Sequence, residues 1–412
     1  MRVAIIGAGA SGLAAACRIG ERAEVVLFEH SDRVGKKILQ TGAGRCNVMN
    51  SAMLPDKFIC DDMKTCEKIL SGCEDRIKNF FEELGLVLRE EDEGRIYPLT
   101  NQAASVLDVL RFAATESGSE IRTGVKIKTI INKGGKYAVA YDDEKPEYFD
   151  KIILACGGKA APKTGSDGSG FAFARTFGHS VTPLAPVLVP LKSKSSIPRA
   201  LKGTRCKCNI TLLKNGKKVK ELGGEIQFTE YGISGIAAMQ ISRYMTDGVH
   251  SVSVDLAPGC SREYIKERLF EARRKKRELQ DILLGIVPRR VAQQIIKSVT
   301  DMSLTECSCK ITDSTLDKIA TCVKGLVLDI DGTLAWDNAQ VTRGGVPLSQ
   351  INPDTMESLY SEGLYIVGEM LDCDGDCGGY NLGWAWITAV IAADGCIGKG
   401  RKRNDQNNRF KG

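Results

Sequence analysis

The stretch RVAIIGAGASGLAAACRIGERAEVVLFE, residues 2–29, decides the fold. Val3 to Ile6 is a continuous apolar run typical of a buried parallel strand. Ser11 to Ile19 has the character of a helix, and Glu24 to Phe28 predicts a second strand. Strand, helix and strand in this order form a βαβ unit, which predicts an α/β protein built on a doubly wound parallel sheet.

The turn between the first strand and the helix indicates a nucleotide site. Gly7-Ala8-Gly9-Ala10-Ser11-Gly12 has Gly-x-Gly-x-x-Gly spacing, and Glu29 ends the next strand. Glycines at this spacing let backbone N–H groups at the positive end of the helix reach a pyrophosphate. The Glu29 carboxylate can accept hydrogen bonds from both ribose hydroxyls and would repel a 2′-phosphate. Either FAD or NAD fits such a turn.

The composition is that of a globular protein with more than one lobe. The chain has 412 residues, of which 43% are hydrophobic and 26% are charged, and a net charge of +6. Its 15 cysteines favour a reducing cytosol and do not imply stable disulfides. No apolar run approaches the roughly 20 residues that a membrane span needs. We therefore expect a soluble, cytoplasmic protein that does not bind membranes.

The first part of the chain, 1–190, is predicted to form the first segment of the nucleotide-binding domain. Amphipathic helices are expected at Cys73 to Leu84 and Ala103 to Ser117. Strands at Glu120 to Ile131 and Tyr137 to Tyr141 predict a small antiparallel excursion, and Phe149 to Ala155 returns to a buried strand. This domain should therefore carry a parallel sheet with an added hairpin.

The middle of the chain predicts an insert. Short alternating segments at 191–258 suggest an antiparallel, barrel-like domain, followed by a small helical subdomain at 259–322 and a return strand at 323–340. Residues 341–396 form the second segment of the nucleotide-binding domain, with a buried strand at Leu364 to Gly368 and a helix at Tyr380 to Ala393. The basic tail, 397–412, is expected to be disordered.

One sequence block distinguishes between the two nucleotides, and two further blocks carry the same family resemblance. GKKILQTGAGRCNVMN, residues 35–50, puts a second glycine-rich loop where an NAD dehydrogenase normally continues with an ordinary helix. IILACGGKAAPKTGSDGSG and VTRGGVPLSQINPDTMESLYSEGLYIVGEMLDCDGDCGGYNLGWAWITA begin at Ile152 and Val341. Together the blocks resemble the BaiN/YhiN-type family of bacterial NAD(P)/FAD-dependent oxidoreductases over nearly the whole chain. The resemblance implies a Rossmann-like FAD-binding domain with an inserted antiparallel β-barrel-like and small helical domain.

The resemblance also implies roles for the matching residues. The FAD pyrophosphate would be held by Gly7, Gly9, Ala10, Ser11 and Gly12, the adenosine ribose by Glu29, and the adenine by the backbone of Ile127. Arg45, Cys46 and Asn47 would lie near the isoalloxazine, Ala155, Gly157 and Gly158 would pass close to the dinucleotide, and Gly368 and Glu369 would approach the ribityl chain. The remaining cofactor-binding candidates are Lys37, Gly44, Asp372, Gly378, Gly379, Tyr380 and Asn381.

The glycine pair Gly378-Gly379 precedes the apolar helix at Tyr380 to Ala393. Unpaired N–H groups at that helix start would point at the N1/C2=O edge of the flavin, where negative charge collects on reduction. The helix dipole would stabilise this charge by about 1 kcal/mol. Three acidic side chains nearby would oppose it, so we expect them to face solvent or to cap the turn: Asp372, Asp374 and Asp376.

Other chemistries have weaker support in the sequence. Cys206-x-Cys208, Cys307-x-Cys309 and Cys373-x-x-x-Cys377 do not provide four local zinc ligands, so no metal is expected. Cys46 near a flavin could relay electrons, but no Cys-x-x-Cys partner lies beside it. LVLDIDGTLAW, residues 326–336, also begins like a haloacid-dehalogenase-type phosphatase. Too few residues follow for that domain, and a barrel strand is predicted instead.

We therefore predict an FAD-dependent oxidoreductase that transfers hydride between the flavin and a small organic substrate. Only one dinucleotide fingerprint is visible, so NAD(P)H would bind transiently in the same cleft as the electron donor. The alternative is a flavin-containing RNA-binding or RNA-modifying protein, suggested by the basic helix at Arg262 to Glu278. Acidic residues interspersed in that helix favour a solvated, salt-bridged face, so nucleic acid is not expected as a partner.

Overall fold

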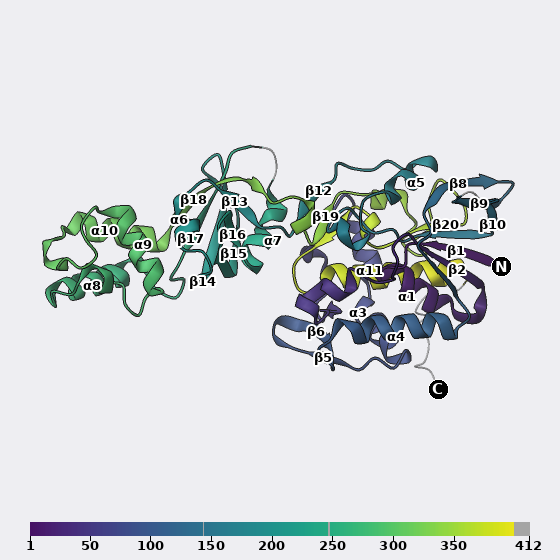
Figure 1. Cartoon of the computed structure of the whole chain (residues 1–412), viewed down its shortest axis with the longest axis horizontal. Helices are drawn as coiled ribbons and strands as arrows, with labels where there is room; N and C mark the ends of the chain where they lie inside the picture. The colour runs from purple at the N-terminus through teal and green to yellow at the C-terminus, as the bar shows by residue number, and fades with distance from the viewer. Residues whose placement is uncertain (143, 246–247, 399–412) are drawn as a thin grey trace, which may run out of the picture. The chain divides into compact units, whose positions relative to one another are not determined.

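The computed structural model describes residues 1–142, 144–245 and 248–398 (Figure 1). The chain divides into two compact units. Unit 1 contains residues 1–186 and the chain from Val341 onward, and unit 2 contains Val187–Gln340. The chain leaves unit 1 through β12 (Ala185–Val187) and returns through β19 (Val341–Arg343). From residue 399 on, the predicted disordered tail lies outside the described residues.

Unit 1 is built on a five-stranded sheet with the order β20-β11-β1-β2-β7. All neighbouring strands in this sheet run parallel. The strands are β1 (Arg2–Ile6), β2 (Glu24–Glu29), β7 (Glu120–Thr123), β11 (Lys151–Leu154) and β20 (Leu364–Ile366). Strand β1 reads as a continuous apolar run because it lies in the middle of the sheet, where Val3, Ala4 and Ile5 are completely buried. The predicted α/β fold class is confirmed.

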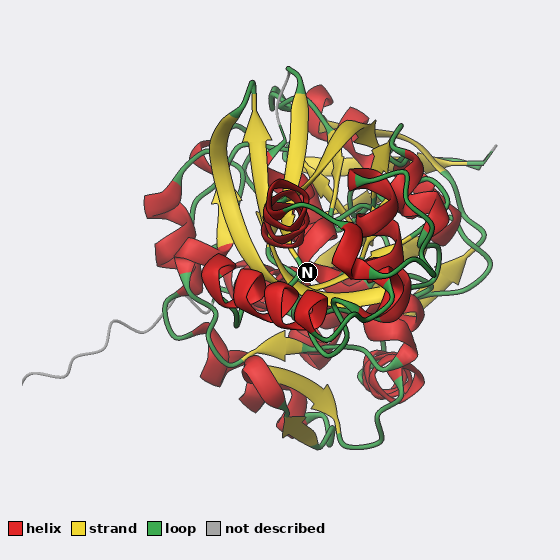
Figure 2. Cartoon of the chain, turned by 90° about the vertical axis from the view of Figure 1, so that its left-hand side faces the viewer, coloured by secondary structure: helices red, strands yellow, loops and turns green. Residues whose placement is uncertain are grey.

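Helices pack against these strands (Figure 2, helices red and strands yellow). Helix α1 (Ala10–Ile19) packs along α11 (Tyr380–Cys396), so elements from opposite ends of the chain lie side by side (Figure 1). Helix α11 carries the buried Trp384 and Trp386, and the indole N–H of Trp386 donates to the carbonyl of Val48 at 2.9 Å. The other helices of unit 1 are α2 (Met63–Leu70), α3 (Cys73–Glu83), α4 (Ala103–Glu116) and α5 (Gly170–Thr176).

The prediction of a single antiparallel strand at Glu120 to Ile131 is wrong. Residues Glu120–Thr123 form β7, which pairs in parallel with β2, and a separate strand β8 (Ile127–Lys133) begins after a turn. The turn is held by two backbone hydrogen bonds: the N–H of Gly124 donates to the carbonyl of Ser31, and the N–H of Val125 donates to the carbonyl of Glu29.

Unit 1 also contains three small antiparallel sheets. The first pairs β8 with β9 (Lys136–Tyr141) and β9 with β10 (Glu147–Phe149). The second has the order β3 (Met49–Asn50), β6 (Arg95–Pro98) and β5 (Leu88–Glu90), and the third pairs β4 (Phe58–Cys60) with β21 (Cys373–Gly375).

Unit 2 contains a closed barrel with the order β13-β16-β15-β14-β17-β18. Its strands are β13 (Leu191–Ser193), β14 (Arg205–Lys214), β15 (Lys217–Phe228), β16 (Gly232–Ser234), β17 (His250–Asp255) and β18 (Leu326–Thr333). Its helices are α6 (Ser196–Ala200), α7 (Ile236–Ile241), α8 (Arg262–Arg274), α9 (Arg289–Val299) and α10 (Asp313–Lys324). Strand β18 alternates between buried and exposed positions, with Asp329 and Asp331 exposed. The acidic motif therefore forms a barrel strand, as the sequence predicted.

The basic helix α8 makes ion pairs within unit 2. Arg262 and Lys266 both contact Asp317, at 2.5 and 2.7 Å, and Arg273 contacts Asp313 at 2.6 Å. These three cations therefore pair with α10. The predicted pairing with an acidic residue near in the sequence is seen at Glu271, which contacts Arg268 at 2.7 Å and Lys275 at 2.6 Å. The nearby Cys307 and Cys309 are joined by a disulfide, which the sequence did not imply.

Candidate functional site

The turn between β1 and α1 gives its three glycines three different environments. A Cβ added to Gly7 would lie 2.5 Å from the carbonyl oxygen of Ala155, and one added to Gly12 would lie 1.8 Å from the carbonyl oxygen of Gly7. A Cβ added to Gly9 would meet nothing within 4 Å. Gly7 and Gly12 are therefore required for packing, whereas the backbone of Gly9 faces open space.

The start of α1 lies at this open space. Gly9 is the N-cap, and the N–H of Leu13 is the first to bond back to the Gly9 carbonyl, at 3.0 Å. The N–H groups of Ala10, Ser11 and Gly12 have no acceptor within the described part of the chain. An anion placed beside Gly9 would meet unpaired donors and the positive end of the helix dipole.

The carboxylate of Glu29 is fixed next to this turn. One oxygen accepts the N–H of Ala8 at 3.0 Å, and the other accepts the N–H of Ser31 at 2.8 Å. Each carboxylate oxygen has lone pairs to spare, so the group can still accept from a ligand hydroxyl. Its two backbone donors hold it in position before any ligand arrives.

Gly368 joins the first turn of α1 to α11. It begins the short helix η11 (Gly368–Met370), and a Cβ added to it would lie 2.8 Å from the hydroxyl oxygen of Ser11. Its N–H donates to the hydroxyl of Thr388 at 3.0 Å, and its carbonyl accepts the indole N–H of Trp384 at 3.2 Å. The structure thus brings the predicted residues Ser11 and Gly368 together, although they are far apart in the sequence.

The next residue, Glu369, links three more segments. One of its carboxylate oxygens pairs with the ammonium of Lys37 at 2.7 Å, and the other accepts the N–H of Thr342 at 2.8 Å. A Cβ added to Gly158 would lie 2.8 Å from Glu369 and 2.3 Å from the Thr342 hydroxyl. That hydroxyl accepts the N–H of Lys159 at 2.7 Å. Lys37, Gly158 and Glu369 therefore form one contact group.

The start of α11 packs on the loop that contains Asn47. A Cβ added to Gly379, the N-cap of α11, would lie 2.4 Å from the backbone of Met49 and 2.8 Å from the side-chain oxygen of Asn47. This Asn47 oxygen is buried and has no hydrogen-bond partner among the described residues. The N–H groups of Tyr380, Asn381 and Leu382 likewise have no acceptor there. The predicted helix start is confirmed, and it carries both unpaired donors and an unpaired acceptor.

Asn381 and Tyr380 stabilise the approach to α11. The side chain of Asn381 accepts the N–H of Gly375 at 2.8 Å and donates to the carbonyl of Gly375 at 2.9 Å. Tyr380 packs edge-on against Phe58, and its burial raises the pKa of its hydroxyl. Both predicted residues therefore hold the loop in place, and the Tyr380 phenol stays protonated at neutral pH.

The guanidinium of Arg45 is held in place by side chains that the sequence did not single out. Its guanidinium contacts both carboxylate oxygens of Glu91 at 2.6 and 2.7 Å, donates to Asn101 at 2.7 Å and stacks 4.0 Å over the ring of Tyr97. The Glu91 carboxylate raises the pKa of Arg45. No signal at single positions could have identified this cage, because its members come together only through β5, β6 and the following turn.

Cys46 and Cys156 are both thiols rather than thiolates. Cys46 is completely buried, and burial raises the pKa of its thiol to about 11. Burial also raises the pKa of Cys156 to about 12. Cys156 lies between Ala155, whose N–H donates to Ile6 at 2.8 Å, and Gly157, which lies against Ser166. A nucleophilic thiolate at either position is disfavoured by the surrounding protein.

One of the three acidic residues before the glycine pair, Asp374, does not face solvent, which corrects the sequence prediction for this residue. Asp374 is only 1% exposed and pairs with Arg343 at 3.2 Å, because β21 carries it into the interior. Asp372 accepts the hydroxyl of Thr182 at 2.8 Å, and burial raises the pKa of its carboxyl group. The negative charge of Asp374 is therefore compensated inside unit 1.

Two predicted residues remain apart from these contacts. Ile127 begins β8 and pairs with Tyr141 in the small antiparallel sheet, and Gly44 ends the short helix η2 (Ile38–Gly44) with open space beside it. Asn50 was not predicted, yet its amide donates to the carbonyl of Gly378 at 3.1 Å. The sequence block GRCNVMN, which ends at Asn50, was the signal that could have identified it.

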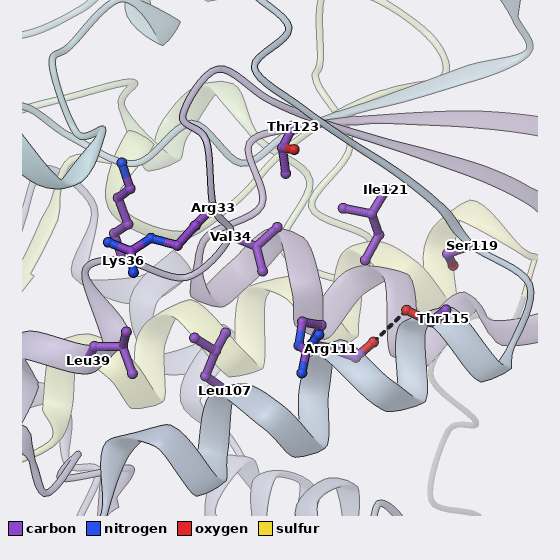
Figure 3. Close-up of a pocket in the computed structure, with 10 residues that line it drawn as sticks. All are labelled: Arg33, Val34, Lys36, Leu39, Leu107, Arg111, Thr115, Ser119, Ile121 and Thr123. Carbon is purple, nitrogen blue, oxygen red and sulfur yellow. Dashed lines mark hydrogen bonds between the residues drawn. The ribbon is translucent and has the colours of Figure 1, made fainter.

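A separate pocket of about 510 Å³ lies along α4 (Figure 3). Figure 3 shows Arg33 and Lys36 on the loop after β2, above Leu107 and Arg111 on the helix. The buried hydroxyl of Ser119, which also lines the pocket, has no hydrogen-bond partner among the described residues. None of the residues predicted to bind the cofactor lines this pocket.

Comparison with known proteins identifies the family. Residues 1–395 match the model of the HI0933-like protein Rossmann domain. The 3-dehydro-bile acid delta(4,6)-reductase of Clostridium scindens is 36% identical over 404 residues, covering 95% of this chain and 98% of that protein. The ribosomal RNA dihydrouridine synthase of Haemophilus influenzae is 28% identical, covering 94% of this chain and 96% of that protein.

Solved structures share the fold. The 3-ketosteroid-delta4-(5alpha)-dehydrogenase of Rhodococcus jostii RHA1, in complex with 4-androstene-3,17-dione, superposes with a TM-score of 0.51 at 13% identity. The match covers 96% of this chain and 96% of that chain.

Among the described residues, no helix has the length and apolar character needed to span a membrane.

The family match and the reductase relative confirm the family recognised from the sequence blocks and the predicted enzyme class, an FAD-dependent oxidoreductase. The match covers both segments of unit 1 and the whole of unit 2. The chain therefore belongs to the HI0933-like Rossmann family.

Proposed function

We propose that this FAD-dependent oxidoreductase holds one FAD in unit 1 and transfers hydride between NAD(P)H and a small organic substrate. FAD, when bound, supplies the hydride chemistry. The observation that carries the proposal is the open space at Gly9, where a Cβ would meet no protein atom within 4 Å. It lies beside three unpaired N–H groups at the start of α1.

The donor set of α1 suits a pyrophosphate. Backbone N–H groups and the positive helix end bind an anion without a cationic side chain, and the missing Cβ of Gly9 allows close approach. Glu29 would accept the adenosine ribose hydroxyls, since its carboxylate is already oriented by Ala8 and Ser31. Lys37 would add positive charge near Gly158, with Glu369 setting its position.

The start of α11 suits the flavin ring. The N–H groups of Tyr380, Asn381 and Leu382 offer donors to negative charge, and the helix dipole adds about 1 kcal/mol of stabilisation. The side-chain oxygen of Asn47 offers an acceptor to a ring N–H, which would satisfy a buried polar atom that otherwise lacks a partner. Both features favour a planar group that has donors and acceptors on adjacent edges.

For the substrate we propose a rigid, largely apolar molecule with a carbon–carbon double bond conjugated to a carbonyl group. The Clostridium scindens relative, whose name specifies reduction of a 3-dehydro-bile acid at the 4,6 positions, supports this class. We propose that NAD(P)H occupies the same cleft transiently, because the chain has one dinucleotide fingerprint, at residues 7–12.

An absorption spectrum of the purified full-length protein tests the proposal. We expect the bands of an oxidised flavin and their anaerobic bleaching by NADH or NADPH, followed by reoxidation with a conjugated steroid enone. Folded protein that is colourless and does not bind added FAD would contradict the cofactor assignment. Bleaching by dithionite but by neither nicotinamide would contradict only the electron donor.

A second candidate is reduction of a base in RNA. It is favoured by the Haemophilus influenzae and Escherichia coli relatives, which are named ribosomal RNA dihydrouridine synthases and are 28% and 26% identical. The pairing of α8 cations with Asp313 and Asp317 argues against a free basic surface on that helix. Retention of the protein on ribosomal RNA at low salt, lost as salt is raised, would favour this candidate.

A further inference from the structure

Three cysteines that are far apart in the sequence meet within unit 1. Cys60 ends β4, Cys66 lies in α2, and Cys373 begins β21. Their sulfur atoms all lie within 4.8 Å of one another, and those of Cys66 and Cys373 are 4.0 Å apart. We call these three residues the thiol cluster. No residue of the cluster belongs to the contacts described around α1 and α11.

The framework of the thiol cluster is fixed by regular secondary structure. Cys60 and Cys373 are direct cross-strand partners in the antiparallel pair β4–β21. Helix α2 begins at Met63, three positions after the end of β4. Its N-cap is Asp62, whose side chain accepts the N–H of Thr65 at 3.2 Å. Because strand and helix are both anchored, the three sulfur atoms are held together without a covalent link.

The surroundings of the thiol cluster suit a cation. Cys66 and Cys373 are buried, whereas Cys60 is partly exposed and gives access from the surface. Two carboxylates directly follow cluster cysteines in the chain, because Asp61 follows Cys60 and Glu67 follows Cys66. A bound cation would balance this negative charge.

We propose that Cys60, Cys66 and Cys373 bind one thiophilic d10 cation, Zn²⁺ or Cu⁺. Thiolate sulfur is the donor that these soft cations prefer. Ligands about 2.3 Å from a central ion place sulfur atoms about 4 Å apart, which agrees with the Cys66 to Cys373 distance of 4.0 Å. Three sulfurs suffice for Cu⁺, and water at the partly exposed Cys60 would complete four ligands for Zn²⁺.

The cation would tie β21 to β4 and α2, and so fix the loop that leads to Gly378-Gly379. This consequence follows because Cys373 lies only five positions before Gly378. The proposed site differs from the sequence expectation that no metal binds, which rested on local cysteine spacings and on the isolation of the three histidines. It does not depend on the proposed substrate or electron donor.

Metal content of the full-length protein tests the site. All samples carry Cys307→Ser and Cys309→Ser, to remove a neighbouring cysteine pair outside the thiol cluster. The protein is stripped with a chelator under anaerobic conditions, offered Zn²⁺ or Cu⁺ alone, passed through a desalting column and analysed by plasma mass spectrometry. We expect one equivalent of one of the two cations in this background. Further substitution by Cys66→Ser with Cys373→Ser should abolish it.

Cys73→Ser with Cys396→Ser is the matched control, because these cysteines are also buried in unit 1 but lie outside the thiol cluster. Retention of metal by the control but not by the cluster variant supports the site. The proposal would be overturned if the protein with an intact thiol cluster retained neither Zn²⁺ nor Cu⁺. It would also be overturned if the cluster variant and the control retained equal amounts of metal.

X-ray absorption of the protein with intact thiol cluster covers the case in which the cluster variant does not fold. Three sulfur neighbours are expected, at about 2.3 Å for zinc. Fewer than three sulfurs would overturn the proposal. A disulfide between two cluster cysteines in freshly purified protein, detected by mass spectrometry without reduction and present in place of metal, would also overturn it.

Discussion

Substitution of Gly9 by alanine separates cofactor binding from folding. The added methyl group would meet no protein atom within 4 Å, and Gly9 has a φ of −83°, which any residue can adopt. Alanine lowers the conformational entropy of the unfolded chain, which stabilises the folded protein by about 0.4–1 kcal/mol. It is also less favourable than glycine as an N-cap, which destabilises the folded protein by a similar amount. The free energy of unfolding of the FAD-free protein should therefore change by less than about 1 kcal/mol.

FAD binding should respond quite differently. The methyl group occupies the space that a pyrophosphate oxygen needs in order to reach the N–H groups at the start of α1. Loss of one hydrogen bond to a charged group costs about 1.5–3 kcal/mol. At 1.4 kcal/mol for each factor of ten, the Kd for FAD should rise by about 10-fold to 150-fold.

The assay is titration of FAD-free protein with FAD, followed by quenching of flavin fluorescence, together with chemical denaturation of the same samples. Gly259→Ala is the matched control, because a Cβ at Gly259 also meets nothing within 4 Å but lies in unit 2. The control should bind FAD as the unsubstituted protein does. Wild-type FAD affinity in folded Gly9→Ala protein would refute the assignment of the open space to the pyrophosphate.

Three further substitutions test other parts of unit 1. Asp374→Asn removes the carboxylate that pairs with Arg343 in the interior. The free energy of unfolding, measured in urea, should therefore fall by about 3 kcal/mol. A change of less than about 1 kcal/mol would contradict a buried ion pair. Glu147 is partly desolvated, which raises its pKa, but hydrogen bonds from Arg122, Tyr141 and Arg2 outweigh this and lower the pKa to about 2. The ionised Glu147 side chain therefore stabilises the folded protein above about pH 4.5, and this stabilisation is lost as the pH falls toward 2. Glu147→Gln should lower the free energy of unfolding by about 1–2 kcal/mol at pH 7 and hardly change it near pH 2. Cys46→Ala should change the rate of flavin reduction by less than about twofold, because the buried thiol is protonated at neutral pH. The free energy of unfolding should fall by about 1 kcal/mol. Flavin reduction about 100-fold slower, measured by stopped flow, would show a redox role.

Local patterns predicted the parts of the fold that depend on short-range rules. The run from Arg2 to Glu29 gave the order of strand, turn and helix, and Gly378-Gly379 marked the start of α11 correctly. These features follow from periodicity and from turn chemistry within a few residues. The short length of chain after residues 326–336 likewise favoured a barrel strand over a phosphatase motif, and the alternating burial of β18 agrees with this prediction.

Features that depend on tertiary contacts could not be predicted from local sequence patterns. Asp374 reads as a solvent-facing acid in the sequence, but β21 pairs with β4 and carries it to Arg343. The spacing of Cys373 and Cys377 directed attention to a local pair, whereas the fold places Cys373 beside Cys60 and Cys66. Sequence distance carries no information about such encounters until the pairing of strands is known.

The division of unit 1 into two chain segments has a consequence for biosynthesis. Strand β20 and helix α11, with its buried tryptophans, complete a core that was begun by β1 and α1. Unit 2 is a continuous segment that ends at Gln340, so a ribosome finishes it before β20 has been made. Unit 2 can therefore fold during translation, whereas the first 186 residues must wait with an incomplete sheet. Over that interval the edge of β11 that later pairs with β20 has no neighbouring strand, and an unpaired strand edge is open to pairing with other chains.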